Sequence, residues 1–89
     1  MKHLSIHVSG KVQGVFFRAS TKEKAEEFKI KGTVRNNADG SVSIEAEGEE
    51  DNLIPFVEWC KRGPKFAHVE RCEIKETGLQ HFKSFTIAR

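Results

Sequence analysis

The chain has 89 residues, of which 15 are lysine or arginine and 13 are aspartate or glutamate, so its formal net charge is +2. This length allows one hydrophobic core and no second one, and we expect residues 1–89 to form a single domain. The charge is too small, and the opposite signs too mixed, to indicate binding to nucleic acid or to a membrane. No signal peptide, transit segment or long apolar run is visible. We therefore expect a cytoplasmic protein in which Cys60 and Cys72 are reduced.

The first expected element is a strand from about Lys2 to Ser9, because polar and apolar residues alternate there. Leu4, Ile6 and Val8 share the face that packs against the core. The residues expected to face solvent are His3, Ser5 and His7. The two histidines would lie about 13 Å apart, which is too far to share one metal ion.

A glycine-bearing turn follows, from Gly10 to Arg18, with the sequence Gly-Lys-Val-Gln-Gly-Val-Phe-Phe-Arg. A turn between a strand and a helix directs several backbone N–H groups to one point, with the positive helix N-terminus behind them, and this favours an anion. A cation in the first helical turn costs about 0.3–1 kcal/mol, unless Arg18 points into solvent or pairs with that anion through its bidentate fork. The alternative is a tight turn with an exposed arginine. Gly10 and Gly14 are one position too close for a P-loop, so a nucleotide site is not indicated.

A helix is expected from about Phe17 to Ile30, because one apolar stripe recurs at helical spacing. Ser20 and Glu23 fit a capping box, which would start the helix three residues later. Both starts keep Arg18 near the helix N-terminus. Gly32 is expected to end the helix. The residues of the apolar stripe are Phe17, Thr21, Ala25 and Phe28.

A hairpin is expected next, with strands Thr33–Asn36 and Ser41–Glu47. The turn between them, residues 37–40, contains Asp39-Gly40, which is a strong hairpin signal. The second strand alternates between apolar and polar side chains. Its inward residues are Val42, Ile44 and Ala46, and its outward residues are Ser43, Glu45 and Glu47.

A second amphipathic helix is expected from Asp51 to Arg62, ended by Gly63-Pro64. Pro55 is acceptable only if this helix begins near Asp51 or Asn52. The remainder is predicted to be extended, with a break at Gly78. Its segments are Phe66–Thr77 and Phe82–Ala88, the latter with Phe85 and Ile87 inward.

The expected order is β-α-β-β-α-β, which predicts an α+β, ferredoxin-like antiparallel sheet with both helices on one face. In that topology the first two strands run parallel with the third between them. Their C-terminal ends then lie at one edge of the sheet. The Gly10 to Arg18 turn and Asn36 are therefore predicted to converge.

Several motifs together resemble the acylphosphatases. The match covers nearly the whole chain, and its most specific part is the Val-Gln-Gly-Val-x-Phe-Arg run followed by an asparagine at the right distance. The sequence differs from the family pattern at Phe16, where a small residue is common, at Thr33 and at residues 28–30. The matching motifs are Gly10-x-Val12-Gln13-Gly14-Val15-x-Phe17-Arg18, Gly32-x-Val34-x-Asn36, Asp39-Gly40-x-Val42, Gly48, Trp59-Cys60-x-x-Gly63-Pro64-x-x-Ala67-x-Val69 and Phe85-x-Ile87.

The resemblance implies hydrolysis of acyl phosphates to a carboxylate and inorganic phosphate, without a metal or another cofactor. By position, Arg18 and the loop amides would bind the phosphate, Asn36 would orient the attacking water, and Asn37 would be a turn residue. The implied partners are a small-molecule acyl phosphate and, as a bound anion, phosphate or sulfate; a monomer is expected. The loop residues in question are Lys11, Val12, Gln13, Gly14, Val15 and Phe16.

Three other functions are compatible with this element order. RNA-binding modules share it but display aromatic residues on the central strands, and Ser41–Glu47 has none. A regulatory anion-sensing domain would keep Arg18 and the turn but would not need Asn36. The fold could also serve inside a larger carbamoyl-transfer assembly, whereas the 89-residue length favours a free-standing protein.

Overall fold

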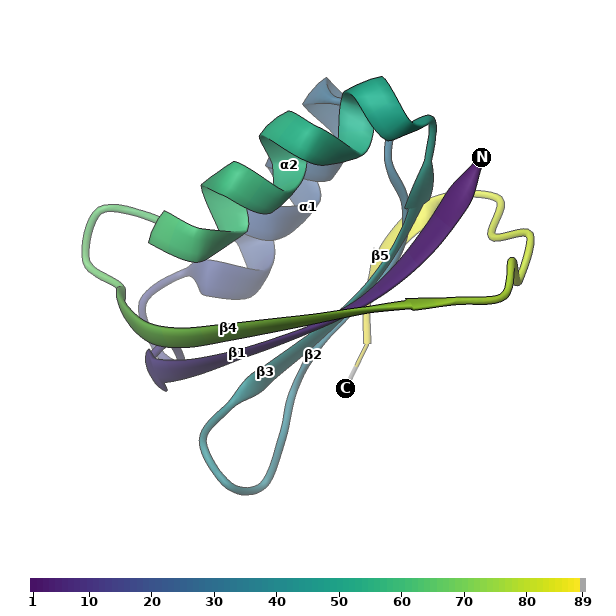
Figure 1. The fold of residues 1–89 in the computed structure, drawn as a ribbon. Helices are drawn as coiled ribbons and strands as arrows, with labels where there is room; N and C mark the ends of the chain where they lie inside the picture. Colours follow the sequence, from purple (N-terminus) through teal and green to yellow (C-terminus); the bar gives the residue numbers. More distant parts are fainter. Residues whose placement is uncertain (89) are drawn as a thin grey trace.

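One five-stranded sheet carries both helices on the same face in the computed structural model, which describes residues 1–88 (Figure 1). The strands lie side by side in the order β4-β1-β3-β2-β5. In chain order the elements are β1 (Lys2–Lys11), α1 (Phe17–Glu27), β2 (Lys31–Asn36), β3 (Val42–Gly48), α2 (Glu50–Arg62), β4 (His68–Thr77) and β5 (Phe85–Ile87).

The strand pairing confirms the predicted topology. Strand β3 is antiparallel to both β1 and β2, so that Ile44 lies opposite Ile6 on one side and Val34 on the other. Strands β1 and β2 therefore run parallel with β3 between them. Strand β4 is antiparallel to β1, whereas β5 is parallel to β2, which makes the sheet mixed. The expected ferredoxin-like α+β fold is confirmed, with this one parallel pair added.

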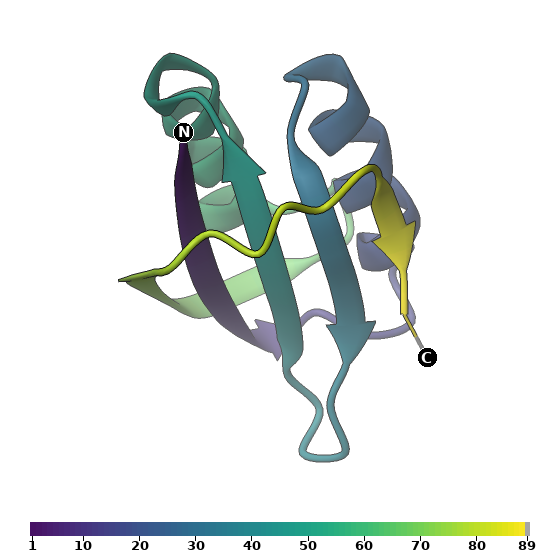
Figure 2. The same ribbon diagram turned by 90° about the vertical axis from the view of Figure 1, so that its right-hand side faces the viewer.

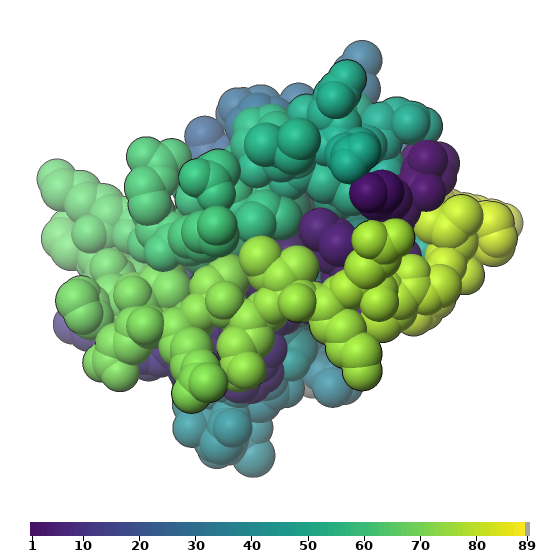
Figure 3. Space-filling view, in the orientation of Figure 1, coloured from purple at the N-terminus to yellow at the C-terminus, as the bar shows by residue number. Residues whose placement is uncertain are grey.

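The hydrophobic core lies between the sheet and the helices. The side chains of Val42, Ile44 and Ala46 are fully buried, as predicted. Phe17 of α1 approaches Trp59 of α2, with ring centroids 5.7 Å apart. Burial of one such side chain contributes about 1.5–3 kcal/mol. Helix α2 and strand β4 cover most of β1 on the face seen in Figure 3.

Helix α1 begins at Phe17 without a side-chain cap. Phe16 precedes it with a left-handed backbone, φ 61°. Ser20 and Glu23 lie inside the helix, so the predicted capping box is wrong. The helix starts early because the left-handed Phe16 turns the chain directly into it, and Ser20 N–H donates to the Phe16 carbonyl at 3.0 Å.

The end of α1 also differs from the prediction. The helix ends at Glu27, and the chain leaves it through Lys29, whose φ is 59°. Gly32 lies in β2 instead, with φ 146°. A Cβ at that position would collide with the backbone carbonyl of Glu45 on the neighbouring strand. Gly32 is therefore needed for strand packing and not as a helix stop.

Helix α2 agrees with the prediction to within one residue. It begins at Glu50, and Gly63 follows its last residue with φ 72°. Pro55 lies in its second turn, where it cannot donate to the carbonyl of Asp51. Asp51 is exposed, so water can reach this part of the helix.

The sheet face opposite the helices is partly covered, which the alternating pattern did not predict. Figure 2 shows the segment from Gly78 to Ser84 crossing this face in front of the strands. Two residues expected to face solvent are buried beneath it, because His3 is 0% exposed and Glu47 is 1% exposed. The solvent-facing assignment of these two side chains is therefore wrong.

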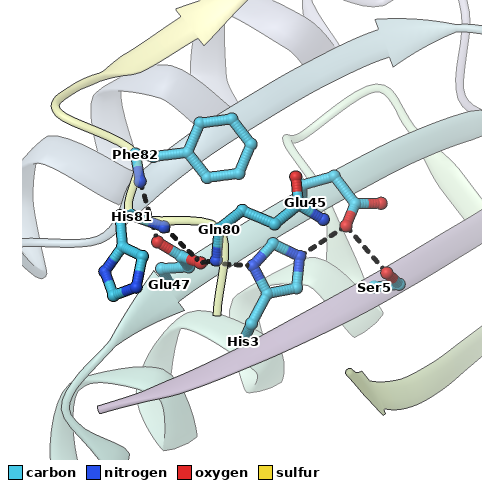
Figure 4. A network of polar contacts seen from close by, with 7 residues as sticks. All are labelled: His3, Ser5, Glu45, Glu47, Gln80, His81 and Phe82. Atoms are coloured by element: carbon cyan, nitrogen blue, oxygen red, sulfur yellow. Dashed lines mark hydrogen bonds and ion pairs between the residues drawn. The ribbon is translucent and has the colours of Figure 1, made fainter. Parts of the chain in front are cut away.

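A polar network connects the covering segment to the sheet (Figure 4). The carboxylate of Glu47 accepts hydrogen bonds from the backbone N–H groups of Gln80, His81 and Phe82. Nδ1 of His3 lies 2.8 Å from Oε2 of Glu47, and its Nε2 lies 2.5 Å from Oε1 of Glu45. With a carboxylate on each ring nitrogen, both nitrogens of His3 can act as donors only when the ring is protonated.

The pKa values of the network follow from these contacts. Burial raises the pKa of Glu47, but the backbone N–H groups of Gln80 and Phe82, with His3, outweigh it and hold the pKa at about 2. Burial lowers the pKa of His3, but the hydrogen bonds to Glu45 and Glu47 outweigh it and raise the pKa above its usual value of 6.5. Glu47 is therefore ionised at neutral pH, and its carboxylate favours the protonated form of His3.

The last strand is shorter than predicted. Phe85 is buried, as expected. Ile87 is 40% exposed, so its predicted inward position is wrong. Strand β5 lies at the edge of the sheet beside β2, and its final side chain therefore reaches the rim of a cleft and not the core.

Both cysteines are free, Cys60 buried and Cys72 half-buried. Burial raises the pKa of both thiols, which disfavours the reactive thiolate. Neither helix in residues 1–88 is long and apolar enough to cross a membrane.

Candidate active site

The turn between β1 and α1 is built by unusual backbone angles. Gly14 has φ 71° and Phe16 has φ 61°. Because α1 starts directly after Phe16, the first N–H groups of the helix have no carbonyl one turn earlier to bind. The residues that carry them, Phe17, Arg18 and Ala19, line a cleft at this end of the sheet. N–H groups left free at a helix N-terminus are the kind of donors that an anion site requires.

The cleft brings together the turn, the end of β2 and the end of β5. Its volume is about 320 Å³. Arg18 and Asn36, which are separated by 18 positions in the sequence, both line it, so the predicted convergence is observed. The full set of lining residues is Val12, Gly14, Phe16, Phe17, Arg18, Ala19, Asn36 and Ile87.

Arg18 is half-buried in the first turn of α1. No acidic residue lies in that turn. Within residues 1–88 none of the ion pairs includes Arg18. A guanidinium at the positive end of a helix dipole is unfavourable by about 0.3–1 kcal/mol until an anion joins it. The position therefore favours a bound anion.

Asn36 is the last residue of β2, and its backbone is paired with Val42 of β3. Its Oδ1 atom is buried and has no hydrogen-bond partner within residues 1–88. Such an unpaired acceptor costs about 1–3 kcal/mol. Asn36 also lines the cleft, so a ligand or a water molecule there is a candidate donor to this atom if the side chain turns toward the cleft.

Asn37 differs from its neighbour, because its side chain stabilises the hairpin. Its Nδ2 donates to the hydroxyl oxygens of Ser41 and Ser43, both at 2.8 Å. Asp39 accepts hydrogen bonds from the Ser41 hydroxyl and backbone N–H, which lower the pKa of its carboxyl. The assignment of Asn37 as a turn residue is consistent with these bonds.

Gln13 holds the glycine turn against the hairpin. Its Nε2 donates to the carbonyl of Asn37 at 2.8 Å and to that of Ser41 at 2.9 Å. Since Asn37 follows Asn36, these bonds fix the turn relative to the end of β2. From the sequence, only the backbone amide of Gln13 was expected to take part in the site, and this side-chain contact was missed. The available signal was a polar residue between two glycines.

The loop residues expected to bind phosphate divide into two groups. Val12, Gly14 and Phe16 line the cleft. Lys11, Gln13 and Val15 do not, with Lys11 exposed at the end of β1 and Val15 in the core. Ile87 was not expected at the cleft, and only the pairing of β5 with β2 places it there.

Among the described residues that line the cleft, Arg18 carries the only charged side chain. Histidines and carboxylates are absent from that lining. Within residues 1–88 no three His, Cys, Asp or Glu side chains are grouped to hold a metal ion. The described lining thus carries one cationic side chain and none that could act as a general acid or base near neutral pH.

Comparison with known proteins assigns the family. The family model of acylphosphatases matches residues 4–87. The acylphosphatase of Oceanobacillus iheyensis is 49% identical over 77 residues, which cover 85% of each chain. The chain belongs to the acylphosphatase family. The acylphosphatase fold is confirmed by the crystal structure of acylphosphatase from Bacillus subtilis, which is 39% identical with a TM-score of 0.97 over 100% of both chains.

A third comparison places the same acylphosphatase fold inside a longer protein. Full-length HypF, in its phosphate- and nucleotide-bound form, matches 99% of this chain with a TM-score of 0.93 and 30% identity, and the match covers 12% of the HypF chain. Family membership and the relatives named acylphosphatase identify an enzyme that hydrolyses acyl phosphates. The RNA-binding and anion-sensing alternatives are not supported.

Proposed function

We propose that Arg18 and the N–H groups around the turn bind the phosphate of the substrate, while Asn36 positions the attacking water. The observation that carries this proposal is that Asn36 lines the same cleft as Arg18. Within residues 1–88 the buried Oδ1 of Asn36 has no hydrogen-bond partner, and Arg18 forms no ion pair. The two groups have complementary chemistry, because Arg18 can only donate hydrogen bonds, as an anion requires, and Oδ1 can accept a hydrogen bond from water.

The reaction requires little beyond this arrangement. Water attacks phosphorus, the bond from phosphorus to the acyl oxygen breaks, and the carboxylate leaves with the electron pair. A carboxylate is a good leaving group, so no general acid is needed. Asn36 cannot accept the proton of the water, and we propose that a phosphate oxygen of the substrate takes it. Catalysis is then positioning and charge stabilisation, which requires no metal.

Gln13 is proposed to act as a positioning residue. Its two hydrogen bonds to the hairpin set the distance between the phosphate-binding turn and Asn36. We further propose that the enzyme acts as a monomer, since all these groups come from a single chain. We propose that it works in the cytoplasm, where its two free cysteines would stay reduced.

The test is hydrolysis of benzoyl phosphate in excess chelator, followed by ultraviolet absorbance. Arg18→Ala should lose phosphate affinity and at least about 10²–10³-fold in turnover, by analogy with removal of one oxyanion donor. Asn36→Ala should lose turnover comparably but still bind phosphate. Arg35→Ala is the matched control, because Arg35 is exposed and does not line the cleft.

Three results would contradict the proposal. Activity that disappears in chelator and returns with a metal would exclude the metal-free reaction. Loss of phosphate binding in Asn36→Ala would contradict the separation of roles. A pH–rate profile that requires an enzyme base near neutrality would contradict proton transfer to the substrate.

A further inference from the structure

Two large apolar side chains at the cleft are left in water. Phe16 is 79% exposed and Ile87 is 40% exposed, and both line the cleft with Arg18 and Asn36. Phe16 also has φ 61°, a left-handed conformation that is unfavourable for a bulky residue. The chain therefore keeps an aromatic ring beside the candidate site at a cost in both hydration and backbone conformation.

The rest of the lining offers nothing to a charged acyl group. Apart from Arg18 and Asn36, the described residues that line the cleft are apolar or glycine. If Arg18 and the turn hold the phosphate, the apolar part of the lining is what remains for the acyl group. The cleft volume of about 320 Å³ is at the small end of the range for ligand sites, about 300–1,000 Å³. It suits a compact substrate with one apolar group.

We propose that Phe16 and Ile87 form the acyl-binding surface, so that the enzyme prefers acyl phosphates with aromatic or branched apolar acyl groups over acetyl phosphate. This inference rests on the proposed phosphate site. An aromatic acyl group can stack on or tilt against the Phe16 ring, and an acetyl group covers too little of that ring to benefit.

The proposed contact between the acyl group and the Phe16 ring would be the same in the bound substrate and in the transition state, because the bonds that form and break are at phosphorus. Binding that is equal in the ground state and the transition state lowers KM without changing kcat. Covering part of one exposed ring corresponds to about a five-fold change in affinity. The preference should therefore appear in KM.

The experiment compares benzoyl phosphate with acetyl phosphate for the wild type, Phe16→Ala and Ile87→Ala. Phe16→Ala should raise KM for benzoyl phosphate about five-fold more than it raises KM for acetyl phosphate. Ile87→Ala should do the same to a smaller extent. The matched controls are Phe66→Ala and Ile54→Ala, because both side chains are exposed and neither lines the cleft.

Inhibition by inorganic phosphate separates acyl binding from turn geometry. The inference predicts an unchanged inhibition constant in Phe16→Ala. If the ratio of KM for benzoyl phosphate to KM for acetyl phosphate is the same in Phe16→Ala as in the wild type, the inference is overturned. Equal losses for both substrates together with weaker phosphate inhibition would also overturn it, because Phe16 would then act only by shaping the turn. Full activity of Arg18→Ala would instead overturn the proposed phosphate site itself.

Discussion

Glu47 offers a sharp test of how the C-terminal segment is held on the sheet. Its buried carboxylate accepts three backbone N–H groups of residues 80–82 and contacts Nδ1 of His3. Glu47→Gln keeps the shape but removes the charge and turns an amide N–H₂ toward these donors. Breaking a buried ionic contact of this kind costs about 3–5 kcal/mol. Small domains have a total stability of about 5–15 kcal/mol, so the loss should be large.

The pH dependence of unfolding gives a second measure of how much Glu47 contributes to the free energy of unfolding. The pKa of Glu47 is held at about 2, below its usual value of 4.5. Its contribution is therefore fully present above pH 4.5 and is lost as the pH falls toward 2, by about 3 kcal/mol in all. His3 behaves oppositely, because its pKa is raised. Its contribution is present below pH 6.5 and is lost as the pH rises through the folded-state pKa.

Urea unfolding at pH 7, 5 and 3 measures the contribution of Glu47. The wild type should lose stability between pH 5 and pH 3 faster than Glu47→Gln, and the two curves should approach each other at the acid end. Glu23→Gln is the matched control, since Glu23 is exposed on α1. Equal pH slopes for wild type and Glu47→Gln would refute the ionised, hydrogen-bonded state of Glu47.

Three further predictions concern the sheet and the cleft. Gly32→Ala should destabilise the fold by about 3 kcal/mol or more in urea unfolding, because the new Cβ meets the Glu45 carbonyl at a positive φ. Gln13→Ala should lose about 1–2 kcal/mol by the same assay and weaken inhibition by phosphate, because two hydrogen bonds that fix the turn disappear. Asn36→Leu should raise the melting temperature, because it removes a buried acceptor that has no partner within residues 1–88. It should also abolish turnover, because leucine cannot position the attacking water. A lower melting temperature of this variant would contradict the assignment of that atom as unpaired.

Local patterns predicted the strands and their inward faces well. The alternation around Ile6 and Ile44 is a property of neighbouring residues, and the core confirms it. The same alternation placed His3 and Glu47 in solvent, because polar residues on the second face of a sheet usually are solvated. Their burial depends on a segment more than thirty residues away in the chain, and no local pattern contains that information.

The candidate site was predictable to the extent that topology determines it. Arg18 lies just after β1 and Asn36 ends the parallel strand β2, so their convergence required only the order of elements. The side-chain contacts of Gln13 and the position of Ile87 depend on rotamers and on the exact length of β5. Lys11, Val15 and the rest of the turn could be assigned only as a group, because the backbone angles decide which N–H groups reach the cleft.

Three locally unfavourable features meet in the cleft, and their coincidence is a physical argument for function. Arg18 stands at the positive end of a helix, Asn36 buries the one side-chain polar atom without a partner in residues 1–88, and Phe16 combines a left-handed backbone with an exposed ring. Each feature lowers the stability of the protein without substrate, and in the proposed mechanism each is relieved by one part of an acyl phosphate or by its attacking water. Because these costs are met when the chain folds, the groups need not reorganise during the reaction.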